Sequence, residues 1–139
     1  MSIIKISVIT ITYNAENVIM RTLDSVLKQT FSNIEHIIID GASKDSTLLA
    51  EREYESRSCS ANNGHEIKII SEPDKGLYDA MNKGIGKATG NYLVFLNAGD
   101  VFPSSSTLET VADMIGDGEE LPGVLFGDTN IVDDNGNFL

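Results

Sequence analysis

The chain has few of the residues on which several common types of protein depend. Its single cysteine, Cys59, allows no internal disulfide, and the two histidines, His36 and His65, have no partners at the spacing of a zinc site or a catalytic group. No apolar run approaches the roughly 20 residues that span a bilayer, and the first residues form no basic leader with a cleavage site. We therefore expect a cytoplasmic protein with structural or exposed histidines.

Positive charge is also scarce. Ten Lys and Arg residues against 21 Asp and Glu give a formal net charge of −11. Because phosphate backbones are bound through a surplus of Lys and Arg, this balance argues against nucleic acid as a partner. The same repulsion acts on the phosphates of a nucleotide, so a nucleotide site in this chain needs a metal ion or local amide donors.

Segments with strand and helix patterns alternate along the chain, and a polar segment at residues 56–65 is predicted to be a surface loop. We expect strands at 3–12, 35–40, 67–71, 92–96 and 124–128, and helices that carry Ile19, Leu23, Val26 and Leu27; Leu48 and Leu49; Leu77, Met81, Ile85 and Ala88; and Leu108, Val111 and Ile115. This alternation predicts one α/β domain with a layered, mostly parallel sheet flanked by helices.

The last residues predict a strand that runs into an Asn135-Gly136 hairpin turn, with a returning strand that stops at Leu139. We therefore expect residues 1–139 to be the amino-terminal portion of a longer protein. A short frayed tail is the alternative.

Polar groups follow three of the predicted strands: Thr12-Tyr13-Asn14, Asp40, and Asn97-Ala98-Gly99-Asp100. The strand before Asn97 is nearly all apolar, which is typical of a parallel strand covered on both faces. Because the carboxyl ends of parallel strands face one ligand crevice, we expect these groups to lie together. They suit a nucleotide, with Tyr13 stacking on a base, Asp40 accepting hydrogen bonds from a base or ribose, and Asp100 coordinating Mg²⁺ or Mn²⁺ that bridges two phosphates.

Each group also has a simpler structural interpretation. Asn14 can cap the next helix, Asp40 can be an ordinary turn residue, and Asp100 can cap a turn. Two known nucleotide motifs are excluded, because the glycines around Gly84 precede a strand instead of following one and no Walker A loop is present.

The order SVITITYNAENVIMRTLDSVLKQTFSNIEHIIIDGASKDST followed by SEPDKGLYDAMNKGIGKATGNYLVFLNAGD strongly resembles the amino-terminal region of family 2 glycosyltransferases, which have the GT-A fold. The resemblance runs from about Ile6 to Asp100. It implies a UDP- or GDP-sugar donor, a divalent cation (Mn²⁺ or Mg²⁺), and usually inverting transfer to a saccharide or lipid-linked acceptor. It also implies a bacterial-type enzyme of cell-surface polysaccharide synthesis in the cytoplasm or at the inner face of the membrane, with peripheral membrane contact through later residues.

The resemblance also implies roles for particular residues. The nucleotide-sugar-binding positions that it carries over are Thr12, Tyr13, Asn14, Glu16, Asp40, Asp74, Lys75, Asn82, Asn97 and Ala98, and Asp100 is the metal ligand. Within this set Asp40 is the base-contacting acid and Lys75 meets a phosphate. The general base is expected beyond Leu139.

The sequence departs from the family pattern at three places. Gly41 replaces the second of two consecutive acids, Met81 replaces an arginine, and Asn97 and Gly99 leave Asp100 as the only acid of the metal motif. We expect a weaker metal site, strengthened when the donor phosphates arrive, with a lost site as the alternative. A noncatalytic nucleotide-sugar-binding module therefore stays open, as does a sugar nucleotidyltransferase, although TYNAEN is not the phosphate loop which that enzyme needs.

Overall fold

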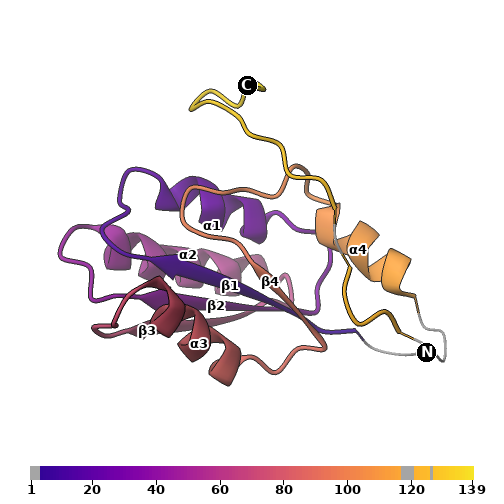
Figure 1. Ribbon diagram of the computed structural model, residues 1–139, viewed down its shortest axis with the longest axis horizontal. Coiled ribbons are helices and arrows are strands. Elements are labelled where there is room, and N and C mark those ends of the chain that lie inside the picture. The colour runs from indigo at the N-terminus through magenta and orange to yellow at the C-terminus, as the bar shows by residue number, and fades with distance from the viewer. Residues whose placement is uncertain (1–3, 117–120, 126) are drawn as a thin grey trace.

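The computed structural model describes residues 4–116, 121–125 and 127–139. Strands and helices alternate within these residues, as predicted (Figure 1). They are β1 (Ile6–Thr12), α1 (Ile19–Leu27), β2 (Ile34–Asp40), α2 (Thr47–Ala61), β3 (Glu66–Ser71), α3 (Leu77–Lys87), β4 (Tyr92–Phe95) and α4 (Thr107–Ile115).

The strands form a parallel sheet in the order β3-β2-β1-β4. In the register of β1 and β2, Thr12 lies opposite Asp40, so both reach the same edge of the sheet. Beyond β4 the chain stays beside β1, because the amide of Ala98 donates to the carbonyl of Ile11 at 3.3 Å. The polar groups that follow three strands therefore share one edge, as predicted.

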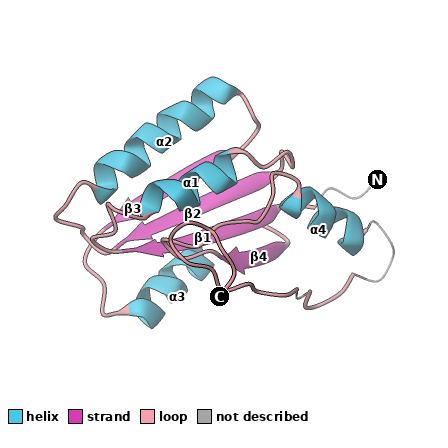
Figure 2. Cartoon of the chain, turned by 90° about the horizontal axis from the view of Figure 1, so that it is seen from above, coloured by secondary structure: helices cyan, strands magenta, loops and turns pink. Residues whose placement is uncertain are grey.

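Helices cover both faces of the sheet. Figure 2 shows α1 and α2 on one face and α3 on the other. The first face is packed by Ile19 and Leu23 of α1 against Ile38 of β2 and Tyr54 of α2. His36 is buried there between the hydroxyls of Thr10 and Tyr54, each 2.7 Å from a ring nitrogen, which confirms a structural role for this histidine.

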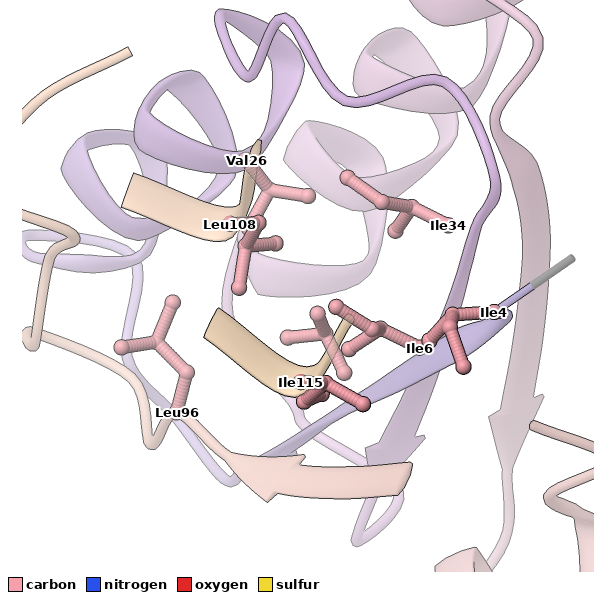
Figure 3. Packing of buried hydrophobic residues seen from close by; sticks show 8 residues of the cluster. Ile4, Ile6, Val26, Ile34, Leu96, Leu108 and Ile115 are labelled. Carbon is pink, nitrogen blue, oxygen red and sulfur yellow. The ribbon is translucent and has the colours of Figure 1, made fainter. Parts of the chain in front are cut away.

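Helix α4 completes another hydrophobic cluster beside α1. Leu108 and Ile115 of α4 pack with Val26, Ile6 and Leu96 (Figure 3). This cluster confirms the predicted helix after Pro103, and it anchors the segment that leaves β4.

The second half of α2 differs from the prediction. Residues 56–61 were expected in a loop but are helical, and α2 ends at Ala61, before Asn62, which has the left-handed φ of 50°. The inner side of this helix buries Tyr54, Glu51 and Ser58, which are polar or amphipathic residues that give no apolar periodicity. The sequence pattern therefore missed a helix whose buried side is not apolar.

The buried face of α3 also differs from the prediction. Leu77 is 51% exposed and Ile85 is 48% exposed, whereas Ala80 and Gly84 face the sheet. A Cβ on Gly84 would lie only 2.5 Å from Cγ2 of Ile9. The helix thus packs too close to β1 for large side chains, and small residues form its inner face.

Strand β4 was expected to be covered on both faces, and this is wrong for the described residues. Tyr92 and Val94 pack toward the α4 cluster, whereas Leu93 is 42% exposed and Phe95 is 36% exposed. The reason is the position of β4 at the edge of the sheet, since α3 packs on β1 and β2.

The carboxyl-terminal residues hold less regular structure than predicted. Among the described residues of 124–128 no strand forms, and Phe126 lies outside them. The predicted hairpin turn is present, with the amide of Gly136 donating to the carbonyl of Asp133 at 3.0 Å. Its strands are reduced to one antiparallel bridge between Val132 and Phe138.

A buried carboxylate organises the opposite, amino end of the sheet. Glu35 is fully buried and accepts hydrogen bonds from Lys68 Nζ at 2.5 Å, Ser7 Oγ at 2.6 Å and the Thr89 amide at 2.8 Å. Burial alone would raise the pKa of Glu35, but these bonds outweigh it and lower the pKa to about 2. The charged carboxylate thereby ties β1, β2 and β3 to the connection between α3 and β4.

The close packing of α3 can be tested with two glycines of the same helix. Gly84→Ala places a methyl group against the buried, stiff side chain of Ile9, and we expect it to lower the free energy of unfolding by about 1–3 kcal/mol. In Gly86→Ala nothing lies within 4 Å of the new Cβ, so its higher helix propensity should raise stability by about 0.5–1 kcal/mol. Urea unfolding measures both. Equal effects of the two substitutions would contradict the packing described here.

Candidate functional site

Loops that follow all the strands of the sheet meet at its carboxyl edge. The loop after β1 and the loop after β2 are joined through Asn14, whose Oδ1 accepts from the Lys44 amide at 2.8 Å while its own amide donates to Ser43 Oγ at 2.8 Å. Asn14 therefore does not cap α1, which begins at Ile19 after Val18. It has the left-handed φ of 46°, which asparagine tolerates better than most residues.

Further bonds hold the same two loops together. Oε2 of Glu16 accepts from the Ser46 amide at 3.0 Å, and Thr47 Oγ1 accepts from the Ala15 amide at 2.8 Å. The Glu16 side chain, which the resemblance places near the nucleotide, thus also serves the loop structure. These bonds make the two loops one unit.

Asp40 lies inside this unit and is fully buried. Its Oδ2 accepts from the Ser43 amide at 2.9 Å and from Ser71 Oγ at 2.7 Å, and its Oδ1 accepts from Ser43 Oγ. Asp40 therefore closes the turn after β2 and links it to the end of β3.

Gly41 allows two more candidate residues to approach each other. A Cβ at this position would lie 2.8 Å from Asp74 Oδ2 and 3.3 Å from Tyr13 Cδ1. An acid at this position would require the Asp74 side chain to move. Tyr13, 59% exposed, and the loop of Asp74 are thus brought together above the end of β2.

The loop between β3 and α3 is held by its own acids. Asp74 Oδ1 accepts from the Gly76 amide at 3.1 Å, and Asp79 Oδ2 accepts from the Lys75 amide at 2.8 Å. Lys75 is exposed in this loop. Asn82 is exposed farther along α3. It is two positions from each of the sheet-facing residues, Ala80 and Gly84, and the structure does not bring it into the group of loops.

The segment from Asn97 to Asp100 turns at the edge beside β1. The amide of Asp100 donates to the carbonyl of Asn97 at 2.9 Å, and the side chains of both residues are exposed. Ala98 is partly buried against α1. Asn97 and Asp100 can offer a neutral and a charged oxygen to a divalent cation. Across residues 4–116, 121–125 and 127–139, no three His, Cys, Asp or Glu side chains gather closely enough to form a protein-only metal site.

A further acid lies under these loops and was not anticipated. Glu51 of α2 is fully buried, and neither carboxyl oxygen has a hydrogen-bond partner among the described residues. Burial, and next the negative charge of Asp40, raise its pKa to about 8. Thr12 is also buried, with an unpartnered hydroxyl. No sequence signal identifies Glu51, because the buried side of α2 is not a stripe of apolar residues.

A parallel sheet with an exposed aromatic ring, a buried carboxylate and an exposed carboxylate at its carboxyl edge belongs to the class of nucleotide-binding α/β folds. The Glycosyl transferase family 2 model matches residues 7–135, and the chain belongs to this family. Among the described residues no helix is both long and apolar enough to cross a membrane.

The chain is similar to several named glycosyltransferases. It is 37% identical over 122 residues to a PGL/p-HBAD biosynthesis glycosyltransferase of Mycobacterium bovis. The matched region covers 88% of this chain but only 45% of that relative. It is 33% identical over 96 residues to glycosyltransferase GlyA of Streptococcus pneumoniae. That match covers 69% of this chain and 13% of the other protein. The matched part of this chain thus spans less than half the length of these relatives.

Solved structures share the fold. The mannosyltransferase PcManGT from Pyrobaculum calidifontis, in complex with GDP-Man and Mn²⁺, superposes with a TM-score of 0.69 at 26% identity, covering 82% of this chain and 33% of that one. TarS residues 1–349 of S. aureus in complex with UDP-GlcNAc has a TM-score of 0.67 at 28% identity, covering 80% and 31%. These matches confirm the predicted GT-A fold and a transferase.

The buried Glu51 predicts an unusual pH dependence of stability. The unfolded chain releases this proton near the ordinary pKa of 4.5, whereas the folded chain holds it to about pH 8. Stability therefore falls as the pH rises between these values. We expect Glu51→Gln to raise the free energy of unfolding by about 1–3 kcal/mol near pH 8 and to have little effect near pH 4. Urea unfolding checks this, with the exposed Glu53→Gln on the same helix as control. A gain of equal size at both pH values would contradict the raised pKa.

Proposed function

We propose that residues 1–139 form the donor-binding portion of a GT-A glycosyltransferase, which transfers a sugar from a nucleotide-diphospho-sugar to a saccharide or lipid-linked acceptor. The observation that carries this proposal is the convergence of Tyr13, Asp40, Asp74 and the Asn97–Asp100 turn at one edge of the sheet. Membership in family 2 supports it, as do the GDP-Man and UDP-GlcNAc complexes of two similar structures.

The geometry suggests a role for each part of the edge. The exposed ring of Tyr13 offers a face for stacking on the base, and Asp40 lies directly behind it at the end of β2. Lys75 provides a positive charge for a phosphate at the side of the edge formed by the β3–α3 loop. Asp100 and Asn97 would hold a Mn²⁺ or Mg²⁺ ion, which supplies positive charge to the departing diphosphate.

The transfer itself requires residues on the acceptor side. In an inverting reaction the acceptor hydroxyl attacks the anomeric carbon, loses its proton to a general base, and the nucleoside diphosphate leaves. We place that base in a segment that follows Leu139, since the matched region covers only 45% of the length of the first relative. Assignment to cell-surface polysaccharide synthesis and contact with the membrane surface belong to this same proposal.

One observation favours a second candidate function. The metal motif offers a single carboxylate, which suits a nucleotide-sugar-binding module without catalysis as well as a weak metal site. Turnover by a chain extended past Leu139, abolished by Asp100→Ala, would eliminate this alternative. A nucleotidyltransferase is disfavoured because the loop after β1, TYNAEN, contains no Lys or Arg.

The donor site is tested by the binding of UDP, GDP and CDP to this chain with and without Mn²⁺. We expect Mn²⁺ to strengthen binding of at least one of them by about tenfold, or 1.4 kcal/mol, and Asp100→Ala to remove this gain. Isothermal titration calorimetry measures it, and Asp113→Ala, an exposed acid on α4, is the control. If none of the nucleotides binds the wild type under either condition, the donor-site proposal fails.

The role of Asp40 is tested by Asp40→Asn, which keeps the size of the side chain and one oxygen acceptor. We expect the differences in affinity among UDP, GDP and CDP to shrink, while binding of the diphosphate is partly retained. Thermal unfolding of the same variant reports on the bonds from Ser43 and Ser71. A uniform loss of all nucleotide binding would show that Asp40 acts only through the loop structure.

A further inference from the structure

An arginine of α1 lies beside the reduced metal motif. Gly99 has a φ of 100°, and a Cβ at this position would lie 3.7 Å from Nη2 of Arg21. A positive charge thus stands next to the position where many relatives carry an additional acid. The same point lies 3.7 Å from Val18, the residue that precedes α1.

The position of Arg21 relative to the motif is held by the backbone. The amide of Gly99 donates to Thr22 Oγ1 at 2.8 Å, and the amide of Phe102 donates to Ser25 Oγ at 3.3 Å. Two successive turns of α1 therefore form hydrogen bonds to the segment on either side of Asp100. The backbone of Arg21 is therefore fixed next to the turn, and its side chain is 41% exposed.

Arg21 is also the arginine whose charge is least engaged. Its ion pair is with Asp134, at 3.9 Å and with an acid that is 99% exposed. In contrast, Arg57 contacts Asp24 at 2.8 Å. An exposed pair at the longer distance contributes little free energy, so a stronger anion can replace Asp134.

The site needs such a charge. The protein carries a net charge of −11, and Asp40 and Asp100 both lie at the carboxyl edge where a diphosphate would sit. Met81 supplies no cation at a position where the family often has an arginine. The planar guanidinium of arginine can donate two hydrogen bonds to one phosphate group. Arginine is therefore well suited to bind a phosphate beside a metal ion that a single carboxylate holds only weakly.

We propose that Arg21 binds the diphosphate of the nucleotide-sugar donor beside Asp100. This inference rests on the proposed donor site and adds a residue to it. The guanidinium supplies positive charge in addition to that of the divalent ion which the reduced motif would hold. Part of the affinity for the diphosphate is then independent of divalent cations.

The test compares Arg21→Gln, Arg21→Lys and wild type by calorimetry. The ligands are the nucleoside diphosphate that the wild type binds best and the matching nucleoside, each with EDTA and with Mn²⁺. We expect Arg21→Gln to weaken diphosphate binding in EDTA by about tenfold and to leave nucleoside binding unchanged, whereas Arg21→Lys should lose less. Arg52→Gln, an exposed arginine on α2 that pairs with Glu55, is the control and should bind like the wild type.

The outcomes separate this inference from the proposed function. Diphosphate binding of equal strength in Arg21→Gln and wild type would overturn the role of Arg21 and leave the donor site intact. Loss of nucleoside binding together with the diphosphate would assign Arg21 a structural role and overturn the inference as well. Absence of any nucleotide binding to the wild type would overturn the proposed function, and the role of Arg21 with it.

Discussion

The bonds of one buried carboxylate hold the candidate site in place. Asp40 is aligned with Thr12 by the register of β1 and β2, and it accepts hydrogen bonds from Ser43 in its own loop and from Ser71 at the end of β3. The loop that it closes in turn bonds to Asn14 in the loop after β1. Three strand ends are thereby connected through one acid, and a buried acid with its hydrogen bonds satisfied is stable in this position. The exposed groups that would meet a ligand stand on this frame.

Much of this arrangement follows from local sequence patterns. The alternation of apolar strands and helices predicted the order of the elements, and the apolar residues of α1 do face the sheet. The polar groups at the strand ends were predicted to converge because parallel strands end at one edge. The same patterns failed where burial does not depend on large apolar side chains. The inner face of α3 is made of Ala80 and Gly84, and the second half of α2 buries Ser58. The exposure of β4 depends on its place at the edge of the sheet, which a strand's own residues do not encode.

The candidate site shows the same division. Residues next to a strand end, such as Asp40 and Asp100, can be proposed from sequence because their position in the chain determines the edge to which they belong. Arg21 and Glu51 cannot, since each lies inside a helix and becomes relevant only through packing. Arg21 meets Gly99 because Thr22 and Ser25 bond to the segment after β4. Glu51 is buried because it lies on the inner side of α2, and its raised pKa follows from that burial and from the nearby charge of Asp40.

The edge position of β4 bears on how this chain behaves in concentrated solution. Its outer side has no strand partner among the described residues, and Leu93 and Phe95 expose apolar surface beside it. Unpaired strand edges of this kind add strands from other molecules. The net charge of −11 opposes such contacts between copies. Dissolved salt at 0.1 M screens this repulsion between charges that are more than about 10 Å apart. The colloidal stability of the chain is therefore set by ionic strength, with low salt keeping the molecules apart and high salt favouring association along this edge.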